Sequence, residues 1–347
     1  MISNRSLVSL AEKLIALVIV VMPFHAFLTL WLSSAVGHFT LIRLWKEGIV
    51  IILAIIIAIL VWREPKLRNS IIHSKLFIIA LAYNLFCVTI GLFAYIAGKV
   101  TLYAFLYGLL LDTRYIVWFG IVYVAARCSG WLGRNWKKLI FIPLALVTLF
   151  ALLQFFILPR NFLEHFGYNS GHTSFVAVVP LNQDSPTIRV TAFSRGANPL
   201  GAYLATFLTL LVVVIYSKKR AIMLWALAAT TFIALFLTFS RSAWLGFIVA
   251  LTAFIWVTFR NVRKIYTFGL LALVGVLVLG AVVVKSGSVQ NAIFHVNDDT
   301  TATVTSNDGH AGALEESVRA FVMWPLGYGP GTAGQASWYN TGHRTIN

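Results

Sequence analysis

Long apolar runs alternate with short polar stretches along almost the whole chain. A helix that crosses a bilayer needs about 20 mostly apolar residues. Because lipid offers no partner to an open backbone group, each run is expected to be helical. The pattern therefore predicts an all-α, polytopic integral membrane protein with about nine transmembrane helices. The runs are Leu14–Val36, Gly48–Trp62, Leu76–Gly98, Leu102–Ala126, Leu139–Leu158, Leu200–Tyr216, Ala221–Phe239, Ser242–Phe259 and Ile265–Val284.

Lysine and arginine gather in the gap after every even-numbered run. These basic gaps contain Arg63, Lys66, Arg68 and Lys75; Arg127, Arg134, Lys137 and Lys138; Lys218, Lys219 and Arg220; and Arg260, Arg263 and Lys264. Basic residues stay on the cytoplasmic side of a membrane. Of the eleven acidic residues, only Glu12 and Glu64 fall on that side. The distribution predicts a multi-pass protein of the cytoplasmic membrane with a cytoplasmic N-terminus.

This topology leaves two long segments outside. We expect a transmembrane helical domain over residues 1–284, with an outer loop at 159–199, and a large outer loop over 285–347. The closing Thr345–Asn347 is neither a span nor a basic tail. It indicates an incomplete C-terminal loop, with more spans to follow.

Composition excludes two other classes of protein. The 347 residues are 59% hydrophobic and 11% charged, with a mean hydropathy of +0.85, whereas soluble domains are about 25% charged. The net charge of +16 does not indicate nucleic-acid binding, which needs a basic solvent-facing surface. Cys87 and Cys128 fall mid-span and at a span end, so no disulfide or metal framework is expected.

Arg241 lies between two apolar runs with almost no loop, in the segment Thr238–Ala243. A charge at a membrane boundary is costly unless it is paired or extends to water. One interpretation is an arginine that merely marks the turn. The other is a cation at headgroup depth that grips a lipid phosphate, which suits the planar guanidinium.

A second group precedes the sixth run, from Arg189 to Gly201. Asn198 and Pro199 form an ordinary helix start, so they need be no more than a cap. Arg189 and Arg195 lie on the outer side, where positive charges are disfavoured. They are either solvated loop charges or ligands for an anion.

The last outer segment holds the third group. Gly327 and Gly329 belong to a glycine-rich turn whose backbone can approach a ligand closely. His310 is a candidate base for taking a proton from a hydroxyl, and His343 is a second candidate of the same kind. A lone loop histidine is more often structural or simply exposed.

Several kinds of chemistry find no support. The chain has no glycine-rich phosphate loop, Cys-x-x-Cys or His-Glu-x-x-His pattern. Asp298 and Asp299 form the one outer acidic pair able to ligate a divalent cation, in a setting of ordinary loop residues. We therefore expect no metal and no cofactor.

Together these residues resemble the O-antigen ligase and O-antigen polymerase superfamily of bacterial inner-membrane glycosyltransferases. The resemblance covers most of the chain and is most specific at Arg189–Gly201, Thr238–Ala243 and Gly309–Gly331. It implies transfer of a glycan from undecaprenyl diphosphate to an acceptor hydroxyl at the periplasmic face. The acceptor is a lipid A-core sugar or another lipid-linked chain, and neither nucleotide nor metal takes part.

The resemblance also implies roles for individual residues. It places Arg189 and Arg241 on the leaving diphosphate, whose developing charge needs fixed cations. It implies Arg195, Asn198, Gly327, Gly329 and His343 as substrate-binding residues and His310 as the base. The family's histidine lies in a His-Asn-type motif just before the next span. His310 belongs to an earlier element, and His343 lacks the motif.

The rival interpretation is a transporter or flippase for lipid-linked glycans. Such proteins concentrate ionisable residues near the bilayer midplane and often contain repeats. Only Asp112 and Arg114 lie inside a predicted span, where they are best explained as a local or interhelical pair. The remaining candidate arginines gather at one face, which favours the transferase.

Overall fold

The computed structural model describes residues 3–169, 175–180, 188–217, 222–259, 306–325 and 327–341. For residues 259 and 306–311 it describes the backbone but not the side chains. Two two-residue strands, β1 (Val179–Pro180) and β2 (Ile188–Arg189), pair antiparallel, with Val179 opposite Arg189. All other regular elements in this part of the chain are helical. The α-helices are α1 (Asn4–Val21), α2 (His25–Val36), α3 (Phe39–Arg43), α4 (Trp45–Arg63), α5 (Pro65–Ile72), α6 (Lys75–Ile96), α7 (Leu102–Cys128), α8 (Trp131–Phe156), α9 (Ala197–Ser217), α10 (Ile222–Leu237), α11 (Arg241–Phe259) and α14 (Ser306–Met323), and the 3₁₀ helices are η1 (Met22–Phe24), η2 (Phe162–Phe166) and η3 (Gly334–Tyr339).

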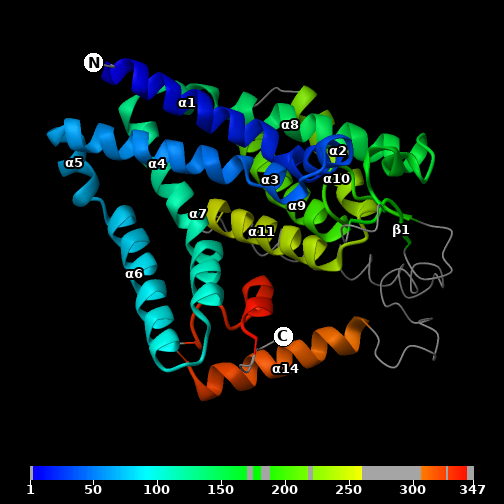
Figure 1. The fold of residues 1–347 in the computed structure, drawn as a ribbon. Coiled ribbons are helices and arrows are strands. Elements are labelled where there is room, and N and C mark those ends of the chain that lie inside the picture. Colours follow the sequence, from blue (N-terminus) through cyan, green and yellow to red (C-terminus); the bar gives the residue numbers. More distant parts are fainter. Residues whose placement is uncertain are drawn as a thin grey trace. The chain divides into compact units, whose positions relative to one another are not determined.

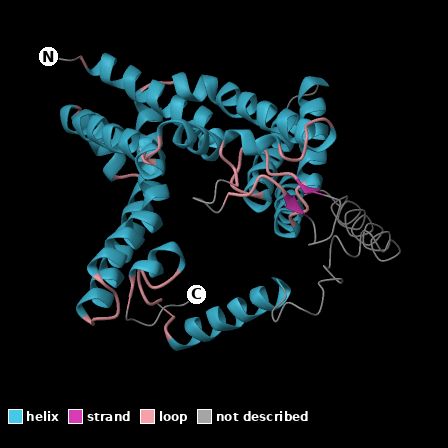
Figure 2. Ribbon diagram, turned by 45° about the vertical axis from the view of Figure 1, so that its right-hand side comes forward, coloured by secondary structure: helices cyan, strands magenta, loops and turns pink. Residues whose placement is uncertain are grey.

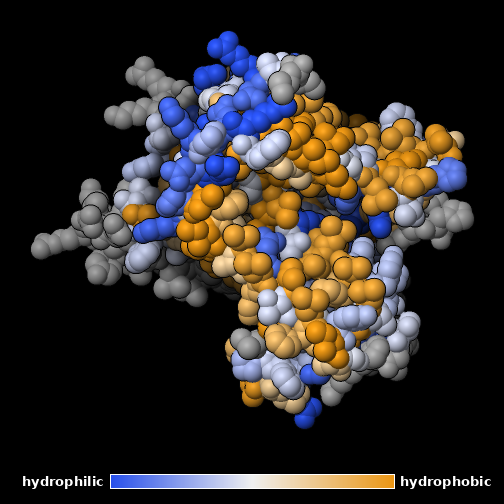
Figure 3. Space-filling view, turned by 60° about the vertical axis from the view of Figure 1, so that its left-hand side comes forward, coloured by the Kyte–Doolittle hydropathy of each residue, from blue (hydrophilic) through white to orange (hydrophobic). Residues whose placement is uncertain are grey.

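The helices confirm a polytopic membrane protein. Within the described residues, seven helical segments are long and apolar enough to span a bilayer, and α10 is a shorter apolar helix. Figure 3 shows apolar side chains over much of the visible surface, as expected where lipid is the solvent. Eight of the predicted runs thus form apolar helices, while the ninth, Ile265–Val284, lies outside the described residues.

Two spans begin earlier than the apolar runs indicate. The first continuous stretch is Asn4–Val36, interrupted by η1 at Pro23, and α8 starts at Trp131. The added turns carry polar residues such as Arg5, Lys13 and Arg134. Arginine and lysine are good helix formers, so the helix continues where hydropathy has already fallen.

The described chain forms two compact units. The first comprises Met1–Ile15, Glu47–Arg134 and Thr300–Asn347, and the second comprises Ala16–Lys46 and Asn135–Asp299. Within each range, only the described residues are assigned to the unit.

In the second unit, α9 is the central helix and contacts both α10 and α11. Its residues Leu200, Leu204, Leu208 and Leu211 are almost completely buried, which is the spacing of one helix face. Gly201 permits the close approach of the neighbouring helix. A Cβ added there would lie 2.8 Å from the Cβ of Ala243 and 2.9 Å from that of Ser240.

In the first unit, α6 and α7 form a helical hairpin, and the segment 327–341 docks onto its closed end (Figure 1). Thr101 donates its backbone N–H to the side-chain oxygen of Asn340 (2.9 Å), and Asn340 donates to the Lys99 carbonyl (3.2 Å). Gly331 has a φ of +93° and packs against the backbone of Ala104. This docking fixes the C-terminal part of the first unit to a span end.

The helix α14 was not foreseen in the last segment. Residues 306–310 were predicted to be loop, but they form the first turns of this helix. Two glycines and several charged residues prevent a continuous apolar run there, so hydropathy gives no helix signal.

Candidate functional site

Arg189 is held by two separate segments of the second unit. Its Nε donates to the Thr238 carbonyl oxygen at 3.0 Å, and its Nη2 donates to the Asn198 side-chain oxygen at 2.6 Å. The next residue, Val190, donates its backbone N–H to the Leu237 carbonyl (3.1 Å). The strand β2 therefore joins the beginning of α9 to the end of α10.

Arg241 is the first residue of α11 and is half-buried. It follows a tight turn in which Phe239 has a φ of +48°. Thr238 stabilises this turn, because its hydroxyl donates to the Leu235 carbonyl at 2.7 Å and accepts the Ser240 N–H at 3.3 Å. The turn thus places a cation at the N-terminus of a span, where the helix dipole is also positive.

The two arginines share one local environment. Burial, and secondly the like charge of Arg241, lower the pKa of the Arg189 guanidinium below its ordinary value. Both causes disfavour the charged form, so the arrangement carries an electrostatic cost. An anion placed between the guanidiniums would reduce that cost. The site is therefore suited to bind a phosphate or another oxyanion.

The loop between β2 and α9 is fixed by Gln154 from α8. The side-chain oxygen of Gln154 accepts the N–H groups of Thr191 (3.2 Å) and Ala192 (2.8 Å), and its amide nitrogen donates to the Thr191 hydroxyl (3.2 Å). Gln154 and Thr191 are buried, with 5% and 0% exposure. This three-bond contact holds the backbone immediately after Arg189.

The same loop is strained and closely packed. Ala192 has a φ of +45°, a region that non-glycine residues rarely adopt. Phe193 stacks on Phe150, with ring centroids 4.2 Å apart, and contacts the rings of Phe24 and Phe27. Strained residues persist only where the surroundings hold them, and they cluster at functional sites. Ala192 and Phe239 are both within three residues of an arginine of the pair.

The structure brings together three of the residues that the sequence singled out in this region. Arg189 donates to Asn198, which is therefore more than a helix start, and Arg241 lies close enough to Arg189 for its charge to lower the pKa of that guanidinium. Arg195 is exposed on the loop before α9. Gln154 was missed, although a glutamine near the end of an apolar run is a signal, since polar groups inside a membrane need a partner.

The remaining predicted residues lie elsewhere or outside the described parts. Gly327 and Gly329 have φ values of +79° and +91°, and Gly329 packs against the backbone of Ile90 on α6. His310 lies on α14, but its side chain is not described, and His343 lies outside the described residues. Their ligand and base roles stay predictions.

Asp112 and Arg114 interact electrostatically, as expected of a local pair, but the guanidinium makes its hydrogen bond elsewhere. Arg114 donates to the Tyr115 hydroxyl (2.9 Å), and its guanidinium carbon lies 4.7 Å from the centre of that ring. In the described part of α7, the two charged groups do not form an ion pair. Asp112 and Arg114 are i and i+2 on the helix, a spacing that does not place side chains on one face.

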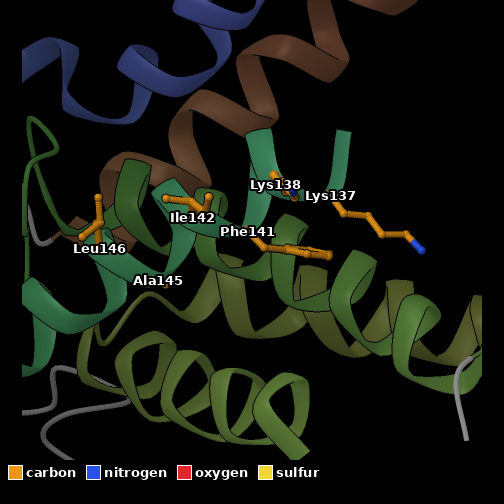
Figure 4. A pocket seen from close by; sticks show the side chains of 6 residues that line it. All are labelled: Lys137, Lys138, Phe141, Ile142, Ala145 and Leu146. Atoms are coloured by element: carbon orange, nitrogen blue, oxygen red, sulfur yellow. The ribbon is translucent and has the colours of Figure 1, made fainter. Parts of the chain in front are cut away.

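No cluster of three metal-binding side chains occurs among the described residues, and the predicted acidic pair Asp298 and Asp299 lies outside them. An open groove runs along α8 and is lined by the residues labelled in Figure 4: Lys137, Lys138, Phe141, Ile142, Ala145 and Leu146. Its lining is apolar except for the two lysines at one end, and the side chain of Lys137 points away from the others (Figure 4). Lysines at the end of an apolar span typically extend to the membrane surface. This groove contains none of the candidate site residues.

The spans and the two arginines define a polytopic membrane protein in which cations gather where β2, α9 and α11 meet. Residues 226–347 match the model of a family described as O-antigen ligase. This region is therefore similar to an O-antigen ligase family domain, which agrees with the resemblance seen in the sequence. No curated protein and no solved structure matches the chain.

The matched region is narrower than the predicted resemblance. It covers a little over a third of the 347 residues and includes Thr238–Ala243 and the glycine-rich run. Arg189–Gly201 precedes it. The contact of Arg189 with Thr238 nevertheless joins that earlier segment to the matched domain.

Proposed function

We propose that this protein is a membrane glycosyltransferase of the O-antigen ligase type. It moves a glycan from undecaprenyl diphosphate to an acceptor hydroxyl at the outer face of the bacterial cytoplasmic membrane. The acceptor is a lipid A-core sugar or another lipid-linked glycan. The observation that carries the proposal is the convergence of Arg189 and Arg241 at the beginning of two apolar helices.

In the proposed reaction, the acceptor oxygen attacks the anomeric carbon of the donor sugar. The bond from that carbon to the diphosphate oxygen breaks, and the hydroxyl proton passes to a base. The leaving diphosphate gains negative charge, which Arg189 and Arg241 stabilise. Stabilisation of developing charge by fixed groups often contributes more to catalysis than any other single effect. The base is proposed to be a histidine of the C-terminal segment, His310 or His343.

Contacts within each unit support the proposed sidedness. In the second unit, the two segments that carry the arginines are both predicted to be outside, and they meet through Arg189 and Thr238. In the first unit, Thr101 and Asn340 come from two gaps that are likewise predicted to be outside.

The predicted cytoplasmic segments of the first unit also meet one another. Asn4 donates to Glu64 (3.1 Å), and Arg127 donates to Ser70 (2.6 Å). These bonds join the N-terminus to the first basic gap and that gap to the second. The polar contacts therefore agree with one division of the chain into inner and outer ends.

Transfer by the purified full-length protein tests the proposal. The protein in detergent is given an undecaprenyl diphosphate-linked glycan and an acceptor, with EDTA and without nucleotide. We expect the glycan to be joined, because the donor is already activated and arginines take the place of a metal. Arg241→Ala serves as the inactive control.

The same experiment separates the transferase from a flippase. In detergent there are not two sides between which a lipid can move, so a flippase has no activity to show. An absence of transfer with several acceptors, together with lipid translocation in vesicles, would establish the transporter. Transfer that is abolished by EDTA would contradict the arginine-based mechanism and direct attention to Asp298 and Asp299.

A further inference from the structure

We propose that α14 lies in the membrane–water interface, with one apolar face inserted between lipid headgroups. The partner of this surface is the bilayer itself. Leu314, Val318 and Phe321 are 67%, 55% and 66% exposed, and Val322 is 72% exposed. The first three follow the i, i+4, i+7 spacing of one helix face, and Val322 widens that face. We call these four residues the apolar face of α14.

The opposite side of α14 is polar. Glu316 and Arg319 point away from the apolar face by their helical positions, whereas Glu315 lies at its edge beside Val322. Residues 312–319 are all exposed, so packing against the described residues of the first unit does not stabilise this part of the helix. Helices in water gain most of their stability from a packed apolar face, and Gly309 and Gly312 weaken this one further. The helix therefore needs a partner along the apolar face.

The C-terminal end of α14 is fixed at a membrane boundary. Lys99, in the turn between α6 and α7, has its ammonium 4.0 Å from the centre of the Trp324 ring and 6.0 Å from that of Tyr328. The helices α6 and α7 are both candidate spans, so their connecting turn lies where a span leaves the bilayer. Trp324 follows the last residue of α14 directly.

The direction of α14 agrees with a position in the membrane plane. In both Figure 1 and Figure 2, α14 extends sideways from the closed end of the α6–α7 hairpin, at a large angle to its two helices. Spans run roughly along the bilayer normal. A helix that extends sideways from the end of such a hairpin runs roughly parallel to the membrane surface.

Aromatic side chains also gather near the turn between α6 and α7, where the spans leave the bilayer. Tyr339 packs edge-on against Tyr103 and Tyr107, with ring centroids 4.8 Å and 5.3 Å apart. Trp338 is 78% exposed. Tryptophan and tyrosine are enriched at both membrane interfaces, where their rings lie at headgroup depth. Trp324 and these rings therefore form an aromatic belt at the span end. Such a belt favours lipid over a second protein copy as the partner of the apolar face of α14.

Spin-label accessibility tests this placement in the full-length protein. Cys87→Ala and Cys128→Ser provide a background without native thiols, and the protein is placed in phosphatidylcholine nanodiscs. Single cysteines are introduced by Leu314→Cys, Val318→Cys and Phe321→Cys on the apolar face, and by Glu316→Cys and Arg319→Cys on the polar face. Accessibility to oxygen reports lipid, and accessibility to a nickel chelate reports water.

We expect oxygen to dominate at the three apolar-face positions, at a depth of about 5–10 Å, and the nickel chelate to dominate at the two polar positions. Introducing Val318→Asp beside a label at position 321 should shift that label toward water, whereas Arg319→Asp, two positions away and on the polar side, should not. Water-like accessibility at all five positions would overturn the proposal. Protection of the apolar face from both reagents would also overturn it, because protein and not lipid would then cover the face.

Discussion

Replacing Gln154 with methionine removes the contact that fixes the backbone after Arg189. Methionine has a similar length and is also unbranched, so the volume of the buried site changes little. It offers no strong acceptor, however, to the N–H groups of Thr191 and Ala192, which Gln154 accepts at 3.2 Å and 2.8 Å. The variant therefore tests whether the strained loop depends on this side chain.

The size of the effect follows from the two lost acceptor contacts. A buried donor left without a partner costs about 1–3 kcal/mol, so two such donors cost about 2–6 kcal/mol if the loop keeps its shape. The positive φ of Ala192 adds about 1–3 kcal/mol of strain, which the loop releases by relaxing. Even a cost of about 2 kcal/mol lowers the population of the native loop about 30-fold.

We expect glycan transfer by Gln154→Met to fall by at least about 30-fold, mainly in kcat, because Arg189 is no longer held where the leaving charge develops. Initial transfer rates over a range of donor concentrations give kcat and KM separately. Gln154→Glu keeps a side-chain oxygen that can accept both N–H groups and should recover most of the activity. The amount of monodisperse protein extracted from membranes reports folding.

Thr148→Val is the matched control. Thr148 is buried on the same helix and its hydroxyl lies 3.3 Å from that of Thr231, so this variant also removes a buried polar contact but leaves the loop unchanged. Its transfer rate should stay near that of the unmodified protein. Full activity of Gln154→Met, or an equal loss in Thr148→Val, would refute the positioning role of Gln154.

Three further predictions concern the arginine site and the topology. Arg241→Ala should abolish transfer while the protein still inserts, and Arg241→Lys should also be poor because an ammonium cannot reproduce a forked contact with two phosphate oxygens; full transfer by the lysine variant would contradict a bidentate role. Gly201→Ala should lower the melting temperature and the transfer rate, since its Cβ would lie 2.8 Å from that of Ala243, whereas Gly246→Ala, with nothing within 4 Å, should be tolerated; equal melting temperatures would show that α9 and α11 can separate at no cost. A reporter that works only in the cytoplasm should be active when fused after Lys219 and inactive when fused after Asp308, and the reverse pattern would move the arginines to the wrong face.

Hydropathy was sufficient to locate the spans because lipid requires each crossing segment to be apolar and helical. It was less informative where polar residues continue a helix, as at Arg134 in α8, and where a helix lacks an apolar run, as in α14. The apolar residues of α14 are spaced along one helix face and are not consecutive, so continuous runs do not reveal them.

The candidate site was predictable in part. The cost of charge at a membrane boundary singled out Arg189 and Arg241 individually, and sidedness placed them on one face. Their meeting depends on the Thr238 carbonyl and on Gln154, which lie 49 and 35 positions from Arg189 in the sequence. Backbone acceptors and single buried amides of this kind leave no pattern in one sequence.

The docking of Asn340 onto Thr101 joins residues that are 239 positions apart. Synthesis proceeds at about 5–20 residues per second, so Thr101 in the turn of the α6–α7 hairpin is made about 12–48 s before Asn340. During that interval, the backbone that later packs against Gly331 has no partner. The nascent chain therefore passes through a lengthy stage in which one of its helical hairpins is incomplete, and membrane chaperones or proteases have time to recognise it. Substitutions at Asn340 or Gly331 should thus act first on the yield of the protein during biogenesis.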